Sequence, residues 1–151
     1  IDFPREGNNW SHKYARRQWN LVDNKDLDYH YLGDFDREML KVIKSEKNLN
    51  RTPVLEMWHN DSDQILAYMR GDLLFVFNFS PTRSFADYGF LVPTGSYDVV
   101  LDTDNKKFGG NGLNDDSMMH LTTYDSLYVD ERKEWLKLYL PARSALVLRK
   151  N

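Results

Sequence analysis

Acidic side chains are the first candidates for chemistry, because cleavage of a glycosidic bond needs two carboxyl groups about 5–10 Å apart across a bound sugar. Asp102 and Asp104 lie at the end of a predicted strand and could form such a pair. Aspartates at strand ends more often form turns, in which the side chain accepts a hydrogen bond from the backbone two residues further on. We therefore interpret these two aspartates as turn residues.

The other chemistry-bearing residues show no pattern typical of a metal or phosphate site. The histidines, at positions 12, 30, 59 and 120, are scattered, and no two of them have the helical spacing with which paired histidines bind zinc. The chain has no cysteine, which excludes a thiolate metal site. The run Gly109-Gly110-Asn111-Gly112 lacks the Lys-Ser/Thr of a phosphate-binding loop. The sequence therefore predicts no metal site.

Aromatic and planar polar side chains are concentrated near the start of the chain. The aromatic members are Phe3, Trp10, Tyr14 and Trp19, and the polar members are Arg5, Asn8, Arg16 and Arg17. Sugar rings dock their apolar faces on aromatic side chains while planar polar groups bind the hydroxyls, so this segment could contact a glucan. The alternative is that the aromatic residues only pack a first helix, and the residues alone leave both interpretations open.

Charge and composition exclude some classes of partner. The net charge is −3 and the isoelectric point about 5.8, which argues against nucleic acid, since phosphate binding needs a basic face. No apolar run approaches the roughly 20 residues that cross a bilayer, so we expect no membrane partner. The absence of cysteine excludes a disulfide framework and agrees with a cytoplasmic protein.

Helices are predicted only in the first third of the chain. Their expected ranges are 12–22, 27–32 and 35–46. Ser11 is a suitable N-terminal cap for the first, Gly33 is expected to stop the second, and Asp34 to cap the third. The third has the clearest apolar stripe, formed by Phe35, Met39, Leu40 and Ile43. The boundary between helices and strands is placed at 48–53.

From Val54 onward the pattern is typical of β-strands. The expected strands are 54–59, 64–70, 73–79, 86–92, 97–102, 118–123, 135–140 and 144–149, with one of the turns at 130–133. Gly71-Asp72 predicts a type II′ hairpin turn, in which the glycine has positive φ. The strand Leu73–Phe79 is apolar on both faces, so it should be central and covered from both sides, by a second sheet and by another element. Phe77 is expected in the core, where removing its ring would cost roughly 3–5 kcal/mol.

These elements predict a mainly β fold, an antiparallel Greek-key β-sandwich of seven or eight strands with two or three N-terminal helices. Residues 51–151 are long enough to bury a core of their own, whereas residues 1–50 are not. The helices must therefore lie on the sandwich or belong to a larger body. The long polar loop Thr103–Asp116 is expected to be mobile, functional or docked on a neighbour. Because the opening IDFPREGNNW reads like the interior of a loop, we expect an excised fragment.

Several stretches resemble the α-1,4-glucan branching enzymes, in the same order along the chain. They are IDFPREGNNWSHKYARRQWNLVD, DFDREML, MRGDLLFVFNFSPTRSFADY, YDVVLDTDNKKFGG and LYLPARSALVL. The first resembles the segment that follows the last strand of that family's catalytic barrel, and the third resembles the start of its C-terminal β-domain. The resemblance covers nearly the whole chain.

The resemblance implies a parent protein that cleaves an α-1,4 linkage and transfers the glucan chain to a 6-hydroxyl, with no metal or organic cofactor. The family's catalytic acids precede the equivalent of Ile1, so no catalytic residue is expected here and the fragment alone should be inactive. The helices would be the remnant of a (β/α)8 barrel, and the partners would be the missing barrel of the same chain and an α-glucan such as glycogen or starch. Because loops after strands form the active face of such a barrel, Arg5, Asn9 and Trp10 are expected nearest the glucan.

Two other readings remain open from the sequence. The chain could be a stand-alone carbohydrate-binding module, or the C-terminal domain of a related amylase or debranching enzyme. A module should show an isolated aromatic platform on a polar surface. A domain cut from a larger enzyme should show a broad apolar patch near the helices.

Overall fold

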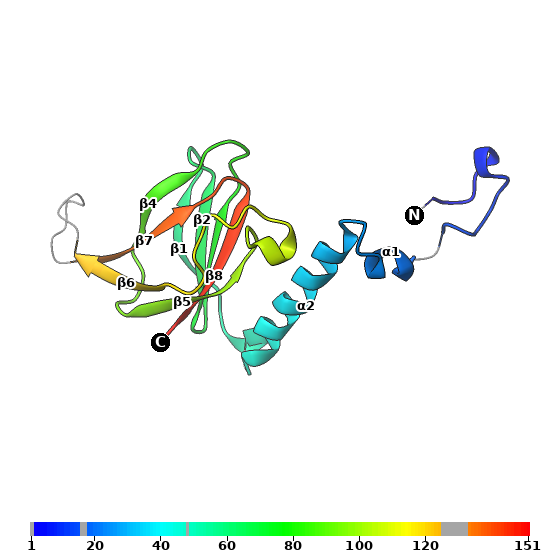
Figure 1. The fold of residues 1–151 in the computed structure, drawn as a ribbon. Coiled ribbons are helices and arrows are strands. Elements are labelled where there is room, and N and C mark those ends of the chain that lie inside the picture. The colour runs from blue at the N-terminus through cyan, green and yellow to red at the C-terminus, as the bar shows by residue number, and fades with distance from the viewer. Residues whose placement is uncertain (1, 16–17, 48, 125–132) are drawn as a thin grey trace.

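The computed structural model describes residues 2–15, 18–47, 49–124 and 133–151. An extended N-terminal segment leads into two helices, α1 (Trp19–Asp23) and α2 (Tyr29–Ser45), and eight strands follow. Figure 1 shows the strands gathered in one body, with α2 against one side of it and the N-terminal segment far from it. The mainly β fold class with preceding helices is confirmed.

All eight predicted strands are present, within one or two residues of their expected ends. They are β1 (Leu55–Asn60), β2 (Ile65–Arg70), β3 (Leu73–Asn78), β4 (Phe85–Phe90), β5 (Ser96–Asp102), β6 (Met119–Tyr124), β7 (Glu134–Leu140) and β8 (Ser144–Lys150). Their order is β1-β2-β3-β8-β5-β6-β7-β4, and every pairing is antiparallel. The strands form one continuous curled sheet in which β6 joins the two layers, where two separate sheets were expected. The Greek-key connection stays a prediction, and of the expected turn at 130–133 only Lys133 lies within the described residues.

The main core lies between the two layers of the curled sheet. Ile65, Leu74 and Leu148 come from one layer, and Phe90 and Leu136 come from the other; all five are at most 2% exposed. Their strands alternate inward and outward residues, which places apolar side chains inside from both layers. Burial of this apolar area is the main stabilising contribution to the domain.

The strand β3 lies between β2 and β8, as its two apolar faces predict. Leu74 and Val76 face the main core and are 0% and 1% exposed. On the opposite face Leu73 is fully buried in a second cluster, to which α2 contributes Phe35, Met39 and Val42. The element expected to cover the second face is therefore α2.

The expectation that Phe77 belongs to the core is wrong. Its side chain is only half-buried, and Phe79, further along the same face, is 59% exposed. The buried cluster beneath α2 includes Leu73 and Phe75 but not these two residues. The rings of Phe77 and Phe79 stack on each other instead, with centroids 5.5 Å apart and planes 3° apart.

The first predicted helix is shorter than expected. Only Trp19–Asp23 is helical. Residues 13–15 form a turn, and residues 16–17 lie outside the described part. The hydroxyl of Ser11 accepts a hydrogen bond from the backbone N–H of Lys13 at 3.2 Å. Ser11 therefore closes a local turn and does not cap a helix.

The second and third predicted helices form one helix, α2, which continues through Gly33. A Cβ atom at position 33 would lie 2.9 Å from Cγ1 of Val22, so glycine allows α1 to approach α2 closely. Asp34 does not cap a helix, because it lies inside α2 and pairs with Arg37 on the next turn. The N-terminal cap position is occupied by Asp28.

The turn between β2 and β3 has the backbone expected of it. Gly71 has φ +63°, and Asp72 is not among the residues with positive φ. This combination agrees with a type II′ turn, whose first central residue alone needs the left-handed region. The turn brings β2 and β3 into register, with Arg70 opposite Leu73.

Candidate functional site

The three residues expected to contact glucan, Arg5, Asn9 and Trp10, lie on one turn. The backbone N–H of Trp10 donates to the carbonyl of Arg5 at 3.0 Å, and that of Asn9 to the carbonyl of Glu6 at 3.1 Å. Asn9 and Trp10 both have left-handed backbone, with φ of 52° and 54°. The sequence prediction therefore selected residues that the structure brings together.

Polar contacts of Asp2 hold this turn. Its carboxylate pairs with the Arg5 guanidinium at 3.1 Å and accepts a hydrogen bond from the Asn8 amide at 3.1 Å. The hydrogen bond from Arg5, followed by that from Asn8, lowers the pKa of Asp2. Trp10 is 67% exposed beside these groups. An exposed indole next to amide and guanidinium donors suits a sugar ring, and contact with glucan stays a prediction.

Asp102 and Asp104 are confirmed as structural turn residues. Asp102 accepts hydrogen bonds from the backbone of Asp104 at 2.8 Å and from the Asn114 amide at 3.1 Å. Asp104 accepts from the backbone N–H groups of Asn111 and Leu113, each at 3.0 Å. Burial raises the pKa of Asp102, and both of its oxygens accept hydrogen bonds from the loop, which assigns the carboxylate to holding the turn.

The loop that these aspartates organise is docked on α2. It contains the 3-10 helix η3 (Lys106–Phe108), whose start is capped by the Asn105 side chain accepting from Lys107 N–H at 2.9 Å. The rings of Phe108 and Phe35 meet edge to face with centroids 5.3 Å apart. Of the three expectations for this loop, docking on a neighbour is the one that the contacts bear out.

A cleft of about 600 Å³ opens where this loop meets the start of α2. The helix contributes Tyr31, Leu32 and Phe35, and its N-terminal cap contributes Asp28. The loop contributes Lys106 and Phe108. The sequence does not predict this site, because its residues are far apart along the chain. The local signal for it is Gly109-Gly110, where the chain can approach another element closely.

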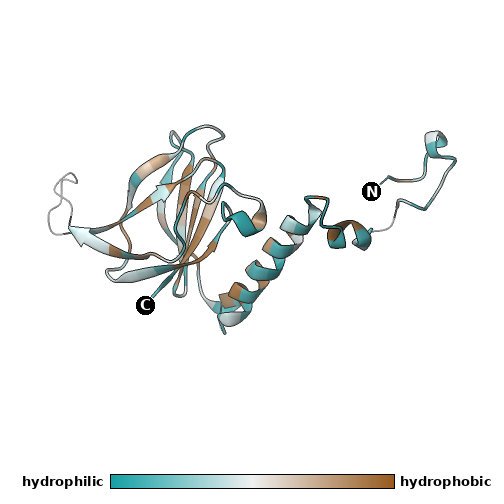
Figure 2. Cartoon of the chain, viewed as in Figure 1, coloured by the Kyte–Doolittle hydropathy of each residue, from teal (hydrophilic) through white to brown (hydrophobic). Residues whose placement is uncertain are grey.

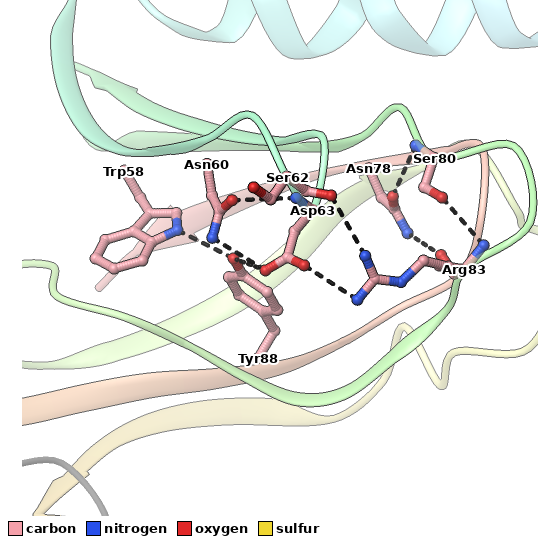
Figure 3. A network of polar contacts seen from close by, with 8 residues as sticks. All are labelled: Trp58, Asn60, Ser62, Asp63, Asn78, Ser80, Arg83 and Tyr88. Carbon is pink, nitrogen blue, oxygen red and sulfur yellow. Dashed lines mark hydrogen bonds and ion pairs between the residues drawn. The ribbon is translucent and has the colours of Figure 1, made fainter.

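A second polar cluster connects the β1–β2 turn to β4 (Figure 3). Tyr88 donates to the Asp63 carboxylate at 3.0 Å and accepts from the Trp58 indole at 3.2 Å. Asp63 also pairs with Arg83 at 3.1 Å and accepts from the Asn60 amide at 3.0 Å. Burial, then the hydrogen bond to Asp63, raises the pKa of Tyr88. The polar groups of this cluster form hydrogen bonds and an ion pair with one another, so we assign the cluster the role of holding the β1–β2 turn.

The remaining candidates carry no site in the part of the chain that is described. No group of three or more His, Asp or Glu side chains there is arranged to hold a metal ion. Asn78 begins an N-x-S triplet, the acceptor pattern for N-glycosylation, but it is 2% exposed inside the sheet. Among the described residues, no helix is long and apolar enough to cross a membrane.

A row of apolar side chains on α2 is left uncovered by the described part of the chain. Tyr29, Leu32, Leu40 and Ile43 recur at helical spacing on a flank next to the stripe that packs on the sheet, and they are between 41% and 70% exposed. We call these four residues the exposed α2 stripe. Figure 2 shows apolar residues on both helices, outside the β body. Such a stripe favours a domain cut from a larger body over a module with an isolated platform.

Comparison with known proteins places this fold in a family. Residues 57–151 match the family described as alpha amylase, C-terminal all-beta domain. The 1,4-alpha-glucan-branching enzymes of Candida glabrata and Rhizophagus irregularis are each 41% identical to the chain over 149 residues, 98% of this chain and 21% and 22% of theirs. The chloroplastic/amyloplastic 1,4-alpha-glucan-branching enzyme of Oryza sativa is 40% identical over 129 residues, 84% of this chain and 16% of its own.

The chain thus spans about a fifth of the length of the curated relatives that it matches over 149 residues. The family match begins within β1 and extends to Asn151, so it contains the curled sheet almost entirely. The helices precede this match, and the curated relatives extend over them as well. The chain belongs to the family of the alpha-amylase C-terminal all-beta domain, which it carries at residues 57–151.

Proposed function

We propose that this chain is the C-terminal accessory part of a 1,4-alpha-glucan-branching enzyme. The parent would cleave an α-1,4 linkage and transfer the glucan chain to a 6-hydroxyl, forming an α-1,6 branch. The observation that carries this proposal is the extent of the similarity, which covers 98% of the chain and includes the helices outside the family match. A related amylase or debranching enzyme that shared only the C-terminal domain would not account for the helices.

In this proposal residues 1–50 are the last loop and helices of the catalytic barrel, and residues 51–151 are the domain that packs against it. The exposed α2 stripe supports this arrangement, because an apolar helix flank needs a cover that the described residues do not provide. The rings of Phe77 and Phe79 add apolar surface on the same side of the sheet as α2. The rest of the parent would bury both surfaces except at Leu32, which also lines the cleft between α2 and the loop after β5.

The role of the chain is then to support the barrel. The catalytic carboxyl groups would come from the rest of the parent, and no cofactor is needed for the transfer. Glucan would be the substrate of the parent, with Arg5, Asn9 and Trp10 on the active face of the barrel. We place the parent in the cytoplasm, although the rice relative carries a name that assigns it to plastids.

The test compares the 151-residue chain with its longer parent in an iodine assay on amylose. Branching shortens the linear segments that bind iodine, so the parent should lower the absorbance of the complex and the chain alone should not. A parent that lacks these residues should lose its activity together with its solubility. Branching by the pure chain would contradict the proposal, and so would full activity and stability of the shortened parent.

The same assay separates the alternatives. If the chain were a stand-alone module, removing it from the parent would leave the activity on soluble amylose unchanged. A debranching or hydrolytic parent would release short chains or reducing ends, which the iodine spectrum and a reducing-sugar assay distinguish from branching.

A further inference from the structure

We propose that the cleft between α2 and the loop after β5 binds a short segment of an α-1,4-glucan chain. This inference rests on the proposed function, which makes α-glucan the polymer that the protein meets. It concerns a site separate from the turn that carries Arg5, Asn9 and Trp10. We call it the junction cleft, formed by the start of α2 and residues 103–110.

The walls of the junction cleft are aromatic and already in contact. The Tyr31 ring lies against Gly109, where an added Cβ would be 2.9 Å from its Cδ2 atom. Phe35 and Phe108 meet edge to face at the base of the same junction. Pyranose rings present C–H faces that pack on such apolar walls. A preformed wall also lowers the entropy lost on binding, because few side chains must become ordered.

The polar groups of the cleft have free hydrogen-bonding capacity. Within the described residues, the carboxylate of Asp28, the ammonium of Lys106 and the hydroxyl of Tyr31 have no hydrogen-bond or ion-pair partner, although all three residues line the cleft. Together they supply a donor, an acceptor and a group that is both. The hydroxyls of a sugar can satisfy all three.

The charges of the cleft agree with a neutral ligand. Asp28 carries a negative charge and Lys106 a positive one, so the pair adds no net charge that would favour an anion or a cation. A neutral polyhydroxylated chain satisfies both. The volume of about 600 Å³ also lies within the range of about 300–1,000 Å³ that small-ligand sites occupy.

The experiment titrates the 151-residue chain with maltohexaose and follows backbone amide shifts by NMR, with cellohexaose as the β-linked comparison. We expect saturable shifts at Gly109, Gly110 and the first turns of α2 with maltohexaose, and weaker binding of cellohexaose. In the double variant Tyr31→Phe/Lys106→Met, loss of two hydrogen bonds should weaken binding by roughly tenfold. Both replacements keep the bulk of the side chain, so the fold should be retained.

The matched control is Lys107→Met, which removes the neighbouring ammonium from the same 3-10 helix at a residue that does not line the cleft. The Lys107 ammonium lies 4.8 Å from the centroid of the Phe108 ring, and the methionine side chain keeps an apolar contact there. The affinity of this variant for maltohexaose should equal that of the unchanged chain. Three results would overturn the junction cleft as a glucan site. The first is amide shifts confined to residues 5–10, and the second is an equal loss of maltohexaose affinity in the double variant and in the control. The third is the absence of binding by a chain that is shown to be folded by its cooperative unfolding. None of these results changes the expected outcome of the iodine test. Failure of this inference can therefore be distinguished from failure of the proposed function.

Discussion

The ring of Tyr31 on α2 packs directly on Gly109, and a Cβ atom added at Gly109 would come within 2.9 Å of that ring. Gly109 also has φ +78°, a conformation that residues with a side chain adopt at a cost. The contact joins the helical part of the chain to the sheet, together with the ion pair between Glu46 and Arg149 at 2.8 Å. The attachment of α2 therefore depends on a glycine.

Replacing Gly109 with alanine should lower the free energy of unfolding through both backbone strain and the clash with Tyr31. The left-handed backbone alone costs roughly 1–2 kcal/mol for a residue with a side chain. The matched control is Gly71→Ala, because Gly71 has φ +63° but nothing within 4 Å of an added Cβ. Urea unfolding should show a larger loss for Gly109→Ala, and equal losses would mean that the Tyr31 contact contributes nothing.

The two faces of β3 should respond differently to truncation. Leu74 is fully buried in the main core, so Leu74→Ala should cost roughly 2–5 kcal/mol. Phe77→Ala should cost less in this chain, because its ring is only partly buried and leaves no closed cavity. In the longer parent the cost of Phe77→Ala should rise as the ring becomes covered. A greater loss for Phe77 than for Leu74 in the chain itself would contradict this assignment of faces.

Asn78 should be important for stability despite its position in an apolar strand. Its amide donates to the carbonyls of Arg83, Leu140 and Pro141 at 2.8 to 3.2 Å, and its oxygen accepts from Ser80 N–H at 3.0 Å. Asn78→Ala should therefore lower the free energy of unfolding by roughly 2 kcal/mol or more, because the buried backbone groups that bond to Asn78 lose their partner.

The control for Asn78 is Asn60→Ala, which removes an amide that bonds within the part-buried β1–β2 turn. Water can replace its hydrogen bonds, so the loss measured by thermal unfolding should be smaller. If Asn60→Ala lowered the stability as much as Asn78→Ala or more, burial would not be what makes Asn78 important.

Stability at alkaline pH should depend on Tyr97. Burial raises the pKa of Tyr97 from 10.0 to about 12, and its hydroxyl donates to the Pro93 carbonyl at 2.6 Å. The folded state keeps this proton at a pH where the unfolded chain has lost it. The contribution of Tyr97 is therefore complete below pH 10 and is lost as the pH rises toward 12.

The measurement is the free energy of unfolding by urea between pH 9 and 12. The decline should be shallower for Tyr97→Phe, which lacks the titrating group, than for the unchanged chain. Tyr124→Phe changes a side chain that is 67% exposed and should follow the unchanged chain. Parallel curves for Tyr97→Phe and the unchanged chain would contradict the role of burial.

Local periodicity was sufficient to predict the eight strands and the central place of β3. Alternation of apolar and polar residues, and turn formers such as Gly71-Asp72, act over a few neighbouring positions, so they can be recognised without a structure. The roles of Asp102 and Asp104 were predictable for the same reason, because their hydrogen bonds are formed within one loop.

Tertiary packing decided the features that depend on residues remote in the chain. The sequence predicts that Gly33 ends a helix, but in the structure this glycine lies inside α2, where Val22 packs against it. The sequence also places Phe77 in the core, but α2 covers its ring only in part. Tyr31 and Gly109 form one wall of the junction cleft only because α2 docks on the loop after β5. The period of a strand is set by its own backbone geometry, whereas contact between distant residues is set by how whole elements pack.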